Sequence, residues 1–333
     1  MKINICRSRT PGFVGWTVAF LLIAYSSARA GEIGGQAGGF LRMGIGADRV
    51  AMGDCGVAMT GGEMSWYYNP ASLPFQHSKQ FSLGYRAMSL DRRVISVDFS
   101  TPLQPNAGLS LGLLRAETSR IDARDFNGVK LDPLSQSENL IHGSFALKPH
   151  PSVAVGISIK WMINAVPNIL DGQKNHYAYA MGLDFGLQAV PWRRLRLGIQ
   201  TPIQNATYNW ESSQIWGDQS ATKKDDIPGS VRVGAEFIPL SGVTLAADLV
   251  MNPDRIGDDS EALEPHFGLE MRRELAPQQT LALRTGWNGK ALALGLGLDF
   301  MLRHHLSARF NYAFLMEQVS PSGSHLIGWV IEI

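Results

Sequence analysis

A histidine and a serine two positions apart are the first residues in this sequence whose types could do chemistry. His142 and Ser144 have the spacing that places two side chains on one face of a β-strand. A base beside a hydroxyl suggests a barrel hydrolase. Nucleophilic catalysis also needs a third group that orients the base, and the sequence specifies none. We therefore predict no hydrolytic site here.

Acidic residues and histidines offer two further candidate sites. One face of a predicted strand carries Glu264, His266, Glu270 and Arg272, and this spread along a strand suits the lining of a lumen better than a metal site. A predicted loop is acidic and could bind calcium through its carboxylates. It lacks the ligand spacing of an EF-hand, so we expect a solvated external loop. Its acids are Asp254, Asp258, Asp259 and Glu261.

Motifs for common enzyme classes are missing from the sequence. We find no Gly-x-Ser-x-Gly, His-Glu-x-x-His, P-loop or dinucleotide fingerprint, and His304-His305 fits a solvated turn. The sequence therefore predicts a protein that is not an enzyme and has no cofactor and no metal site.

Composition narrows the class of protein. The 333 residues contain 30 Lys and Arg against 29 Asp and Glu, a net charge of +1 that argues against a nucleic-acid partner. A mean hydropathy of −0.04 excludes a bundle of transmembrane helices. An exported soluble protein and a membrane β-barrel remain.

Residues 1–30 are typical of a cleavable signal peptide. Lys2 and Arg7 belong to a basic start, residues 13–25 form an apolar core, and Ala28-Arg29-Ala30 gives the small-x-small pattern of a cleavage site. Cleavage removes Cys6 and leaves Cys55 alone, so no intramolecular disulfide is expected.

Alternating apolar and small residues dominate the chain from residue 79 onward. Val153, Val155, Ile157, Ile159 and Trp161, for example, alternate with small or polar residues, which is the signature of a β-strand. Fourteen segments have this pattern, near residues 79–87, 92–101, 106–116, 138–148, 152–163, 176–187, 193–201, 230–238, 242–251, 263–272, 279–287, 290–301, 304–315 and 324–333.

The second face of these strands distinguishes a barrel from a sandwich. It is rich in Gly, Ala and Ser, with charges of both signs in mid-strand, which suits the wet interior of a closed barrel whose apolar face contacts lipid. A soluble periplasmic β protein is the alternative. The predicted lumen-lining residues are Arg86, Asp98, Lys160, Asp184, Arg196, Arg232, Glu236, Asp248, Glu270, Arg272, Arg284, Asp299 and Arg309.

Connection lengths agree with an outer-membrane barrel. Counted from the first strand, the even connections are short and the odd ones include the four longest, near 117–137, 164–175, 202–229 and 252–262. Such barrels have short periplasmic turns and long external loops. We expect a bacterial outer-membrane protein with both termini in the periplasm and lipid as its surroundings.

Residues 31–78 alternate poorly and are rich in glycine, so we predict a plug, folded into the periplasmic mouth of a barrel formed by residues 79–333. Residues 40–54 (FLRMGIGADRVAMGD) lead to residues 65–73 (SWYYNPASL). This stretch resembles the N-terminal signature of the PorV/PorQ family, which is similar to FadL-type transport barrels with an N-terminal hatch. The triplet Asn69, Pro70 and Ala71 matches the hatch motif, and Asn followed by Pro makes a rigid corner.

Two functions follow from this resemblance. The first is passage of a hydrophobic or amphipathic small molecule across the outer membrane, with inward glycines such as Gly182, Gly186, Gly295 and Gly297 allowing a bend or a close approach to the plug. The alternative is a PorV-like component that receives or shuttles secreted protein cargo in type IX secretion. The expected partners are therefore a hydrophobic ligand or secretion-system and cargo proteins.

Overall fold

The computed structural model is an antiparallel β-sheet protein, described for residues 37–125, 127–167, 175–204, 206–211, 222–252, 263–303, 306–317 and 322–333. The predicted signal peptide, the start of the predicted plug and the acidic loop 254–261 lie outside the described residues. Among those residues, no helix has the length and apolar character needed to cross a bilayer.

Four short helical turns precede the sheet, and alternation then runs through the strands. The turns are η1 (Gly39–Arg42), α2 (Ala47–Val50), α3 (Ser65–Tyr68) and η2 (Pro70–Phe75). The strands are β1 (Gln80–Met88), β2 (Arg92–Leu103), β3 (Ala107–Ile121), β4 (Leu134–His150), β5 (Val153–Pro167), β6 (Asn175–Trp192), β7 (Leu195–Gln204), β8 (Ala206–Glu211), β9 (Thr222–Ile227), β10 (Val231–Leu240), β11 (Val243–Met251), β12 (Leu263–Ala276), β13 (Gln279–Trp287), β14 (Leu292–Arg303), β15 (Leu306–Leu315) and β16 (Ser324–Glu332).

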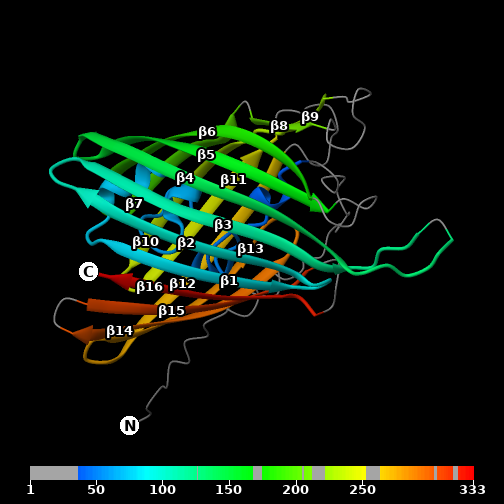
Figure 1. The fold of residues 1–333 in the computed structure, drawn as a ribbon. Coiled ribbons are helices and arrows are strands. Elements are labelled where there is room, and N and C mark those ends of the chain that lie inside the picture. The colour runs from blue at the N-terminus through cyan, green and yellow to red at the C-terminus, as the bar shows by residue number, and fades with distance from the viewer. Residues whose placement is uncertain are drawn as a thin grey trace, which may run out of the picture. The chain divides into compact units, whose positions relative to one another are not determined.

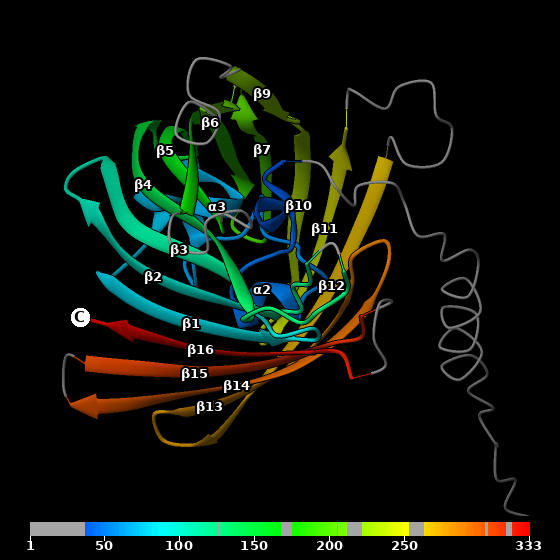
Figure 2. The same cartoon turned by 45° about the vertical axis from the view of Figure 1, so that its right-hand side comes forward.

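Fourteen of these strands close into a barrel. Each strand of the series β1–β7 and β10–β16 pairs antiparallel with its neighbours, β7 pairs with β10, and β1 pairs with β16 to close the ring (Figures 1 and 2). Strands at each predicted segment confirm the predicted fold class and strand number. The period-two pattern is sufficient for this prediction because a barrel wall has two chemically different faces.

The other two strands, β8 and β9, form a hairpin within a segment that we predicted from the sequence to be a loop. β8 follows β7 almost directly, pairs briefly with β6, and then pairs with β9. Trp210 Nε1 donates a hydrogen bond to Asp225 Oδ2 across the hairpin at 2.8 Å. The signal was present, because Ala206, Tyr208 and Trp210 alternate with polar residues. The predicted loop 202–229 therefore contains an extra strand pair.

The two barrel faces have opposite chemistry. Large apolar side chains such as Leu113, Phe145, Trp161 and Met181 are exposed on the outside, whereas Gly, Ala, Ser and charged side chains face in. A belt of exposed apolar side chains this extensive indicates contact with lipid.

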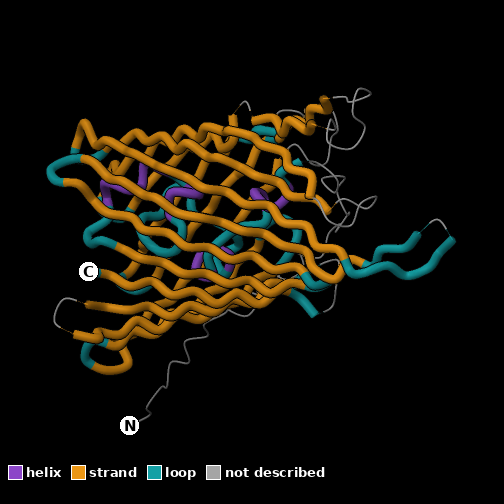
Figure 3. The backbone as a smooth tube through the Cα atoms, in the orientation of Figure 1, coloured by secondary structure: helices purple, strands orange, loops and turns teal. Residues whose placement is uncertain are grey.

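The barrel ends differ in their connections. The long-loop end carries the β3–β4 connection 122–133, a loop that projects well beyond the other connections (teal in Figure 3). The short-turn end carries tight turns such as 104–106 and 193–194, and Ile333 lies there.

Candidate functional site

Residues 37–79, here called the inner segment, lie inside the barrel. Residues 44–59 and 62–74 are buried throughout. Phe40 and Met43 lie beside the β1–β2 turn at the long-loop end, whereas the backbone of Lys79 pairs with that of Ile333 at the other end. The segment therefore runs the length of the lumen instead of filling one mouth (blue in Figures 1 and 2).

Glycines on the inner face of the wall let this segment approach the strands closely. Added methyl groups would collide with the backbone of Ala71 at Gly156, with that of Val57 at Gly198, and with that of Met52 at Gly268. These glycines occur as cross-strand pairs, so each pair opens a shallow seat in the wall. The pairs are Gly84 with Gly328, Gly156 with Gly186, Gly198 with Gly234, and Gly268 with Gly286.

Gly186 and Gly295, which the sequence suggested for close approach, contact the inner segment. Gly186 lies against Asn69, and Gly295 lies against Ala51. Gly297 instead lies near the side chains of Arg284 and Asn311. Here glycine acts through its lack of a side chain.

Asn69 fixes the turn in the middle of the inner segment. Its Oδ1 accepts a hydrogen bond from the Ala71 backbone N at 2.9 Å, which caps η2, and Pro70 occupies the first helical position. Its Nδ2 donates to the carbonyls of Val57 at 2.8 Å and Leu187 at 3.0 Å. The triplet thus joins two parts of the inner segment to strand β6.

Wall side chains bind the irregular backbone of the inner segment. Asp248 Oδ2 accepts hydrogen bonds from Gly56 N at 2.7 Å and Val57 N at 3.0 Å. Gln188 donates to the Ala58 carbonyl, Gln200 donates to the Tyr67 carbonyl, and both distances are 2.7 Å. Buried backbone groups outside regular structure need such partners, so these side chains fix the path of the chain.

A wall side chain also binds the backbone of the inner segment at the long-loop end. Arg86 Nη1 donates to the carbonyls of Met43 at 2.5 Å and Gly44 at 3.3 Å. The Arg86 guanidinium also lies 3.6 Å from Glu317. The start of the inner segment is therefore held through a charged side chain.

Aromatic residues of α3 pack on charged wall residues. The Trp66 ring stacks on His142 with a centroid distance of 3.4 Å, and Lys160 lies 5.4 Å from the Trp66 ring centroid. Lys160 Nζ is 2.6 Å from Asp184 Oδ2, and both side chains are buried. Pairing of this kind is required for a charge that is removed from water.

His142 and Ser144 acquire the third partner that the sequence did not specify. His142 Nε2 lies 3.1 Å from Asp98 Oδ1, and its Nδ1 lies 3.1 Å from Ser144 Oγ. Ser144 Oγ is also 2.7 Å from Ser158 Oγ, and these side chains are buried beneath Trp66. No substrate can reach this hydroxyl in the packed arrangement, so the chain of hydrogen bonds supports the wall.

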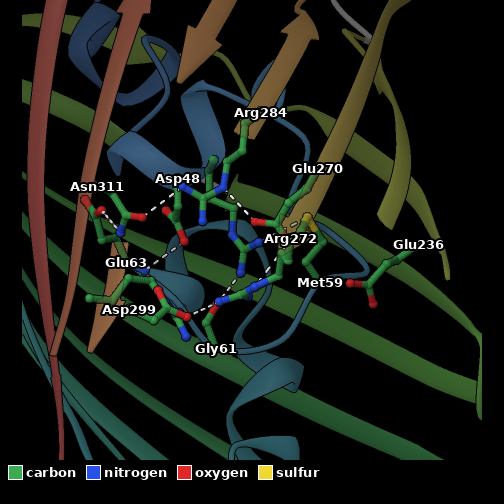
Figure 4. A network of polar contacts seen from close by, with 12 residues as sticks. Asp48, Met59, Gly61, Glu63, Glu236, Glu270, Arg272, Arg284, Asp299 and Asn311 are labelled. Carbon is green, nitrogen blue, oxygen red and sulfur yellow. Dashed lines mark hydrogen bonds and ion pairs between the residues drawn. The ribbon is translucent and has the colours of Figure 1, made fainter. Parts of the chain in front are cut away.

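A second polar network joins the inner segment to strands β12–β15 (Figure 4). Arg284 donates to Glu270 at 2.7 Å and to Asn311 at 2.8 Å, and Asn311 donates to Glu63 of the inner segment at 2.8 Å. Asp299 accepts hydrogen bonds from Arg272 and Arg309. Alternating charge around the wall leaves no large field of one sign.

All thirteen charged residues predicted to line the lumen are buried or partly buried. The partly exposed members are Arg196, Arg272, Asp299 and Arg309. The buried members are Arg86, Asp98, Lys160, Asp184, Arg232, Glu236, Asp248, Glu270 and Arg284. Sequence reasoning missed Gln188, Gln200 and Asn311, since it considered only charged side chains; their inward strand positions were the available signal.

The acidic and histidine residues of β12 that were considered as a metal site do not converge on one point. Glu264, His266 and Glu270 occupy alternate positions on β12, so they spread along the wall. The part of the chain that the structure describes holds no group of three or more His, Cys, Asp or Glu arranged for a metal ion.

A cavity of about 210 Å³ opens between the inner segment and strands β1–β4 at the long-loop end. Phe40 and Met43 line one side, and the strands contribute Met88 and Ala116 to an apolar floor. Its polar lining residues are Arg92, Arg93, Glu117, Thr118, Gln136 and Glu138. The cavity thus combines an apolar floor with a charged rim, as ligand sites for small molecules commonly do.

A second cavity, of about 330 Å³, lies at the short-turn end. Its lining includes Pro74 and Phe75 of the inner segment, Pro102 and Leu103 at the end of β2, and Pro105 of the β2–β3 turn. Lys148 Nζ lies 5.3 Å from the Phe75 ring centroid. The inner segment therefore separates one cavity at each barrel end.

Comparisons with known proteins point to one kind of barrel. No family model and no curated protein matches the sequence. Among solved structures, the chain is similar to the toluene transporter TodX of Pseudomonas putida, with 13% identity, TM-score 0.59 and coverage of 87% of this chain and 96% of that one.

Two further structures resemble the chain to a similar degree. The toluene transporter TbuX of Ralstonia pickettii has 14% identity and a TM-score of 0.56, with coverage of 87% and 97%. A Pseudomonas aeruginosa FadL homologue has 11% identity and a TM-score of 0.56, with coverage of 86% and 96%. The resemblance to PorV/PorQ stays a prediction from the sequence. The chain has the fold of the FadL-like outer-membrane transport barrels.

Proposed function

We propose that this protein is an outer-membrane channel that admits small hydrophobic or amphipathic molecules. In this proposal residues 1–30 are a cleaved signal peptide, residues 31–78 are the plug, and the thirteen charged residues line the lumen around it. Asn69, Pro70 and Ala71 form the fixed corner of the plug. Lipid surrounds the apolar belt.

The observation that carries this proposal is the inner segment, which runs through a closed fourteen-stranded barrel from one end to the other and separates a cavity at each end. A structural barrel has no need of a buried irregular segment whose backbone depends on wall side chains such as Asp248 and Gln188. A gated channel does, because the segment closes the lumen to water and can be displaced. The likeness to toluene transporters supports an apolar ligand.

Uptake by whole cells tests the function. Radiolabelled toluene and a medium-chain alcohol would be supplied to cells with the wild-type gene and to cells in which it is deleted. We expect slower uptake of at least one compound after deletion and recovery on complementation. Unchanged uptake of both would refute transport.

A pull-down from detergent distinguishes the alternative role. Mass spectrometry of the native, solubilised protein would show an apolar small molecule without a stoichiometric protein partner. Secretion components or a surface protein recovered in stoichiometric amount would instead support the handling of protein cargo.

A further inference from the structure

We infer that the long-loop cavity is a binding site for a small apolar molecule with a hydrogen-bond-donating head group, a hydroxyl or an ammonium, and that it rejects carboxylates. The inference rests on the proposed function and adds the class of substrate.

The floor of the cavity sets the size and the apolar part of the ligand. Phe40, Met43, Met88 and Ala116 give it an aromatic ring, two thioethers and a methyl group. An apolar cavity of about 150 Å³ already holds benzene. A volume of about 210 Å³ therefore accommodates one aromatic ring with a small substituent.

The strand register places the polar residues of the cavity side by side. Ala116 pairs with Glu138, and Thr118 pairs with both Gln136 and Arg92. The carboxylate of Glu138 thus lies directly beside the apolar floor. A head group that lies over Ala116 meets this carboxylate.

The cations around the cavity are already engaged. Arg92 Nε donates to the Ser89 carbonyl at 3.0 Å, and its Nη2 lies 3.2 Å from Glu317. Arg93 Nη2 lies 2.8 Å from Glu117, which Arg115 also contacts at 3.2 Å. An incoming anion would have to compete with these carboxylates for the two guanidinium groups.

Glu138, in contrast, is short of donors on the cavity side. It accepts a hydrogen bond from Asn164 Nδ2 at 3.3 Å, which is long. Arg42 acts on Glu138 electrostatically, but its guanidinium nitrogens are buried and it does not line the cavity. The ligand therefore faces an acceptor, and a donor complements it.

Four probes with one ring test the head-group preference: toluene, benzyl alcohol, benzylamine and benzoate. Their binding to the full chain in lipid nanodiscs would be measured by ligand-observed NMR, with empty nanodiscs as background. We expect benzyl alcohol and benzylamine to bind more tightly than toluene, and benzoate about tenfold more weakly than benzyl alcohol, a ratio typical of one hydrogen bond to a charged group.

Two variants locate the effect. Glu138→Gln should weaken benzylamine binding about tenfold and bring benzoate closer to benzyl alcohol, since the amide carries no charge. Ala116→Phe should abolish binding of the donor probes by filling the cavity. Glu264→Gln is the matched control, because this acid also lies toward the long-loop end but does not line the cavity, and it should leave the order unchanged. The heat-dependent shift of the folded barrel on gels verifies that each variant is folded.

The outcomes separate the two proposals. Benzoate binding equal to that of benzyl alcohol, or an unchanged order in Glu138→Gln, would overturn the head-group preference and leave toluene uptake unaffected. Unchanged uptake of both toluene and the medium-chain alcohol after gene deletion would refute transport, whatever the order of the four probes.

Discussion

At the scale of single residues, wall side chains supply the hydrogen-bond partners that the backbone of the inner segment would otherwise lack. Asp248 receives two backbone N–H groups, while Gln188 and Gln200 each give a hydrogen bond to a carbonyl. An unpaired buried N–H costs about 1–3 kcal/mol. A few wall residues can therefore decide whether the inner segment keeps its position.

Removing the Asp248 carboxylate should loosen the loop around Gly56. In Asp248→Ala two buried donors lose their acceptor, so we expect amide exchange of residues 52–59 to rise about tenfold or more. Mass spectrometry of that peptide is the measurement. Asp248→Asn keeps a carbonyl oxygen and should change exchange less. Equal exchange in both variants and the wild type would contradict the role assigned to Asp248.

Period two separates inward from outward residues, and the thirteen charged residues predicted on the inward face are buried or half-buried. Which wall side chain contacts which residue of the inner segment could not be predicted. Glu63 reaches Asn311 across 248 positions of sequence, and nothing local encodes such a pair. Neutral partners such as Gln200 were missed for the same reason, since an inward glutamine gains its role only from the segment packed against it.

At the scale of elements, the glycine pairs convert four places in the wall into seats for the inner segment. A strand normally loses packing at glycine, but here the loss on one face is replaced by contact with the backbone or side chains of the segment. Period two predicted the strands in this case. It could not predict the path of residues 37–79, which have no period. The strands β8 and β9 were left unassigned because each is only six residues long, although β8 alternates.

A methyl group added to the inner face of the wall should displace the inner segment locally and destabilise the folded barrel. In Gly198→Ala the new Cβ collides with the Val57 backbone, so we expect a loss of about 1–3 kcal/mol in the free energy of unfolding. Urea titration of tryptophan fluorescence would measure it. Gly143→Ala is the matched control, because its added carbon would meet only Leu111 Cδ2 at 3.4 Å, and we expect a change within about 0.5 kcal/mol. Similar losses in both variants would argue against a specific seat.

At the scale of the whole molecule, the inner segment is the difference between a closed and an open pore. Barrels somewhat larger than this one leave a water-filled channel when nothing occupies the lumen. The polar wall network would line such a channel, with charges of both signs and no strong selectivity for either ion.

Deleting residues 31–76 while keeping the signal peptide should therefore open the barrel. In planar bilayers we expect stable, ohmic conductance well above that of the full chain, because the residues that fill the lumen are gone. Conductance no greater than that of the full chain would show that another part of the protein closes the pore. The variant with Gln188 and Gln200 both changed to Ala is a milder test, in which brief openings are expected if the deletion does not assemble.

The pairing of the first strand with the last has a consequence for biogenesis. The inner segment precedes β1 along the chain and ends where Lys79 meets Ile333, so it is enclosed only when β1 joins β16. We expect the segment to enter the lumen before β1 pairs with β16, since the closed wall then blocks sideways movement. This predicts an order of assembly in which the inner segment is positioned first and the pairing of β16 with β1 comes last. A cross-link that fixes the seam early, such as one between residues 83 and 329, should yield a barrel with its interior vacant.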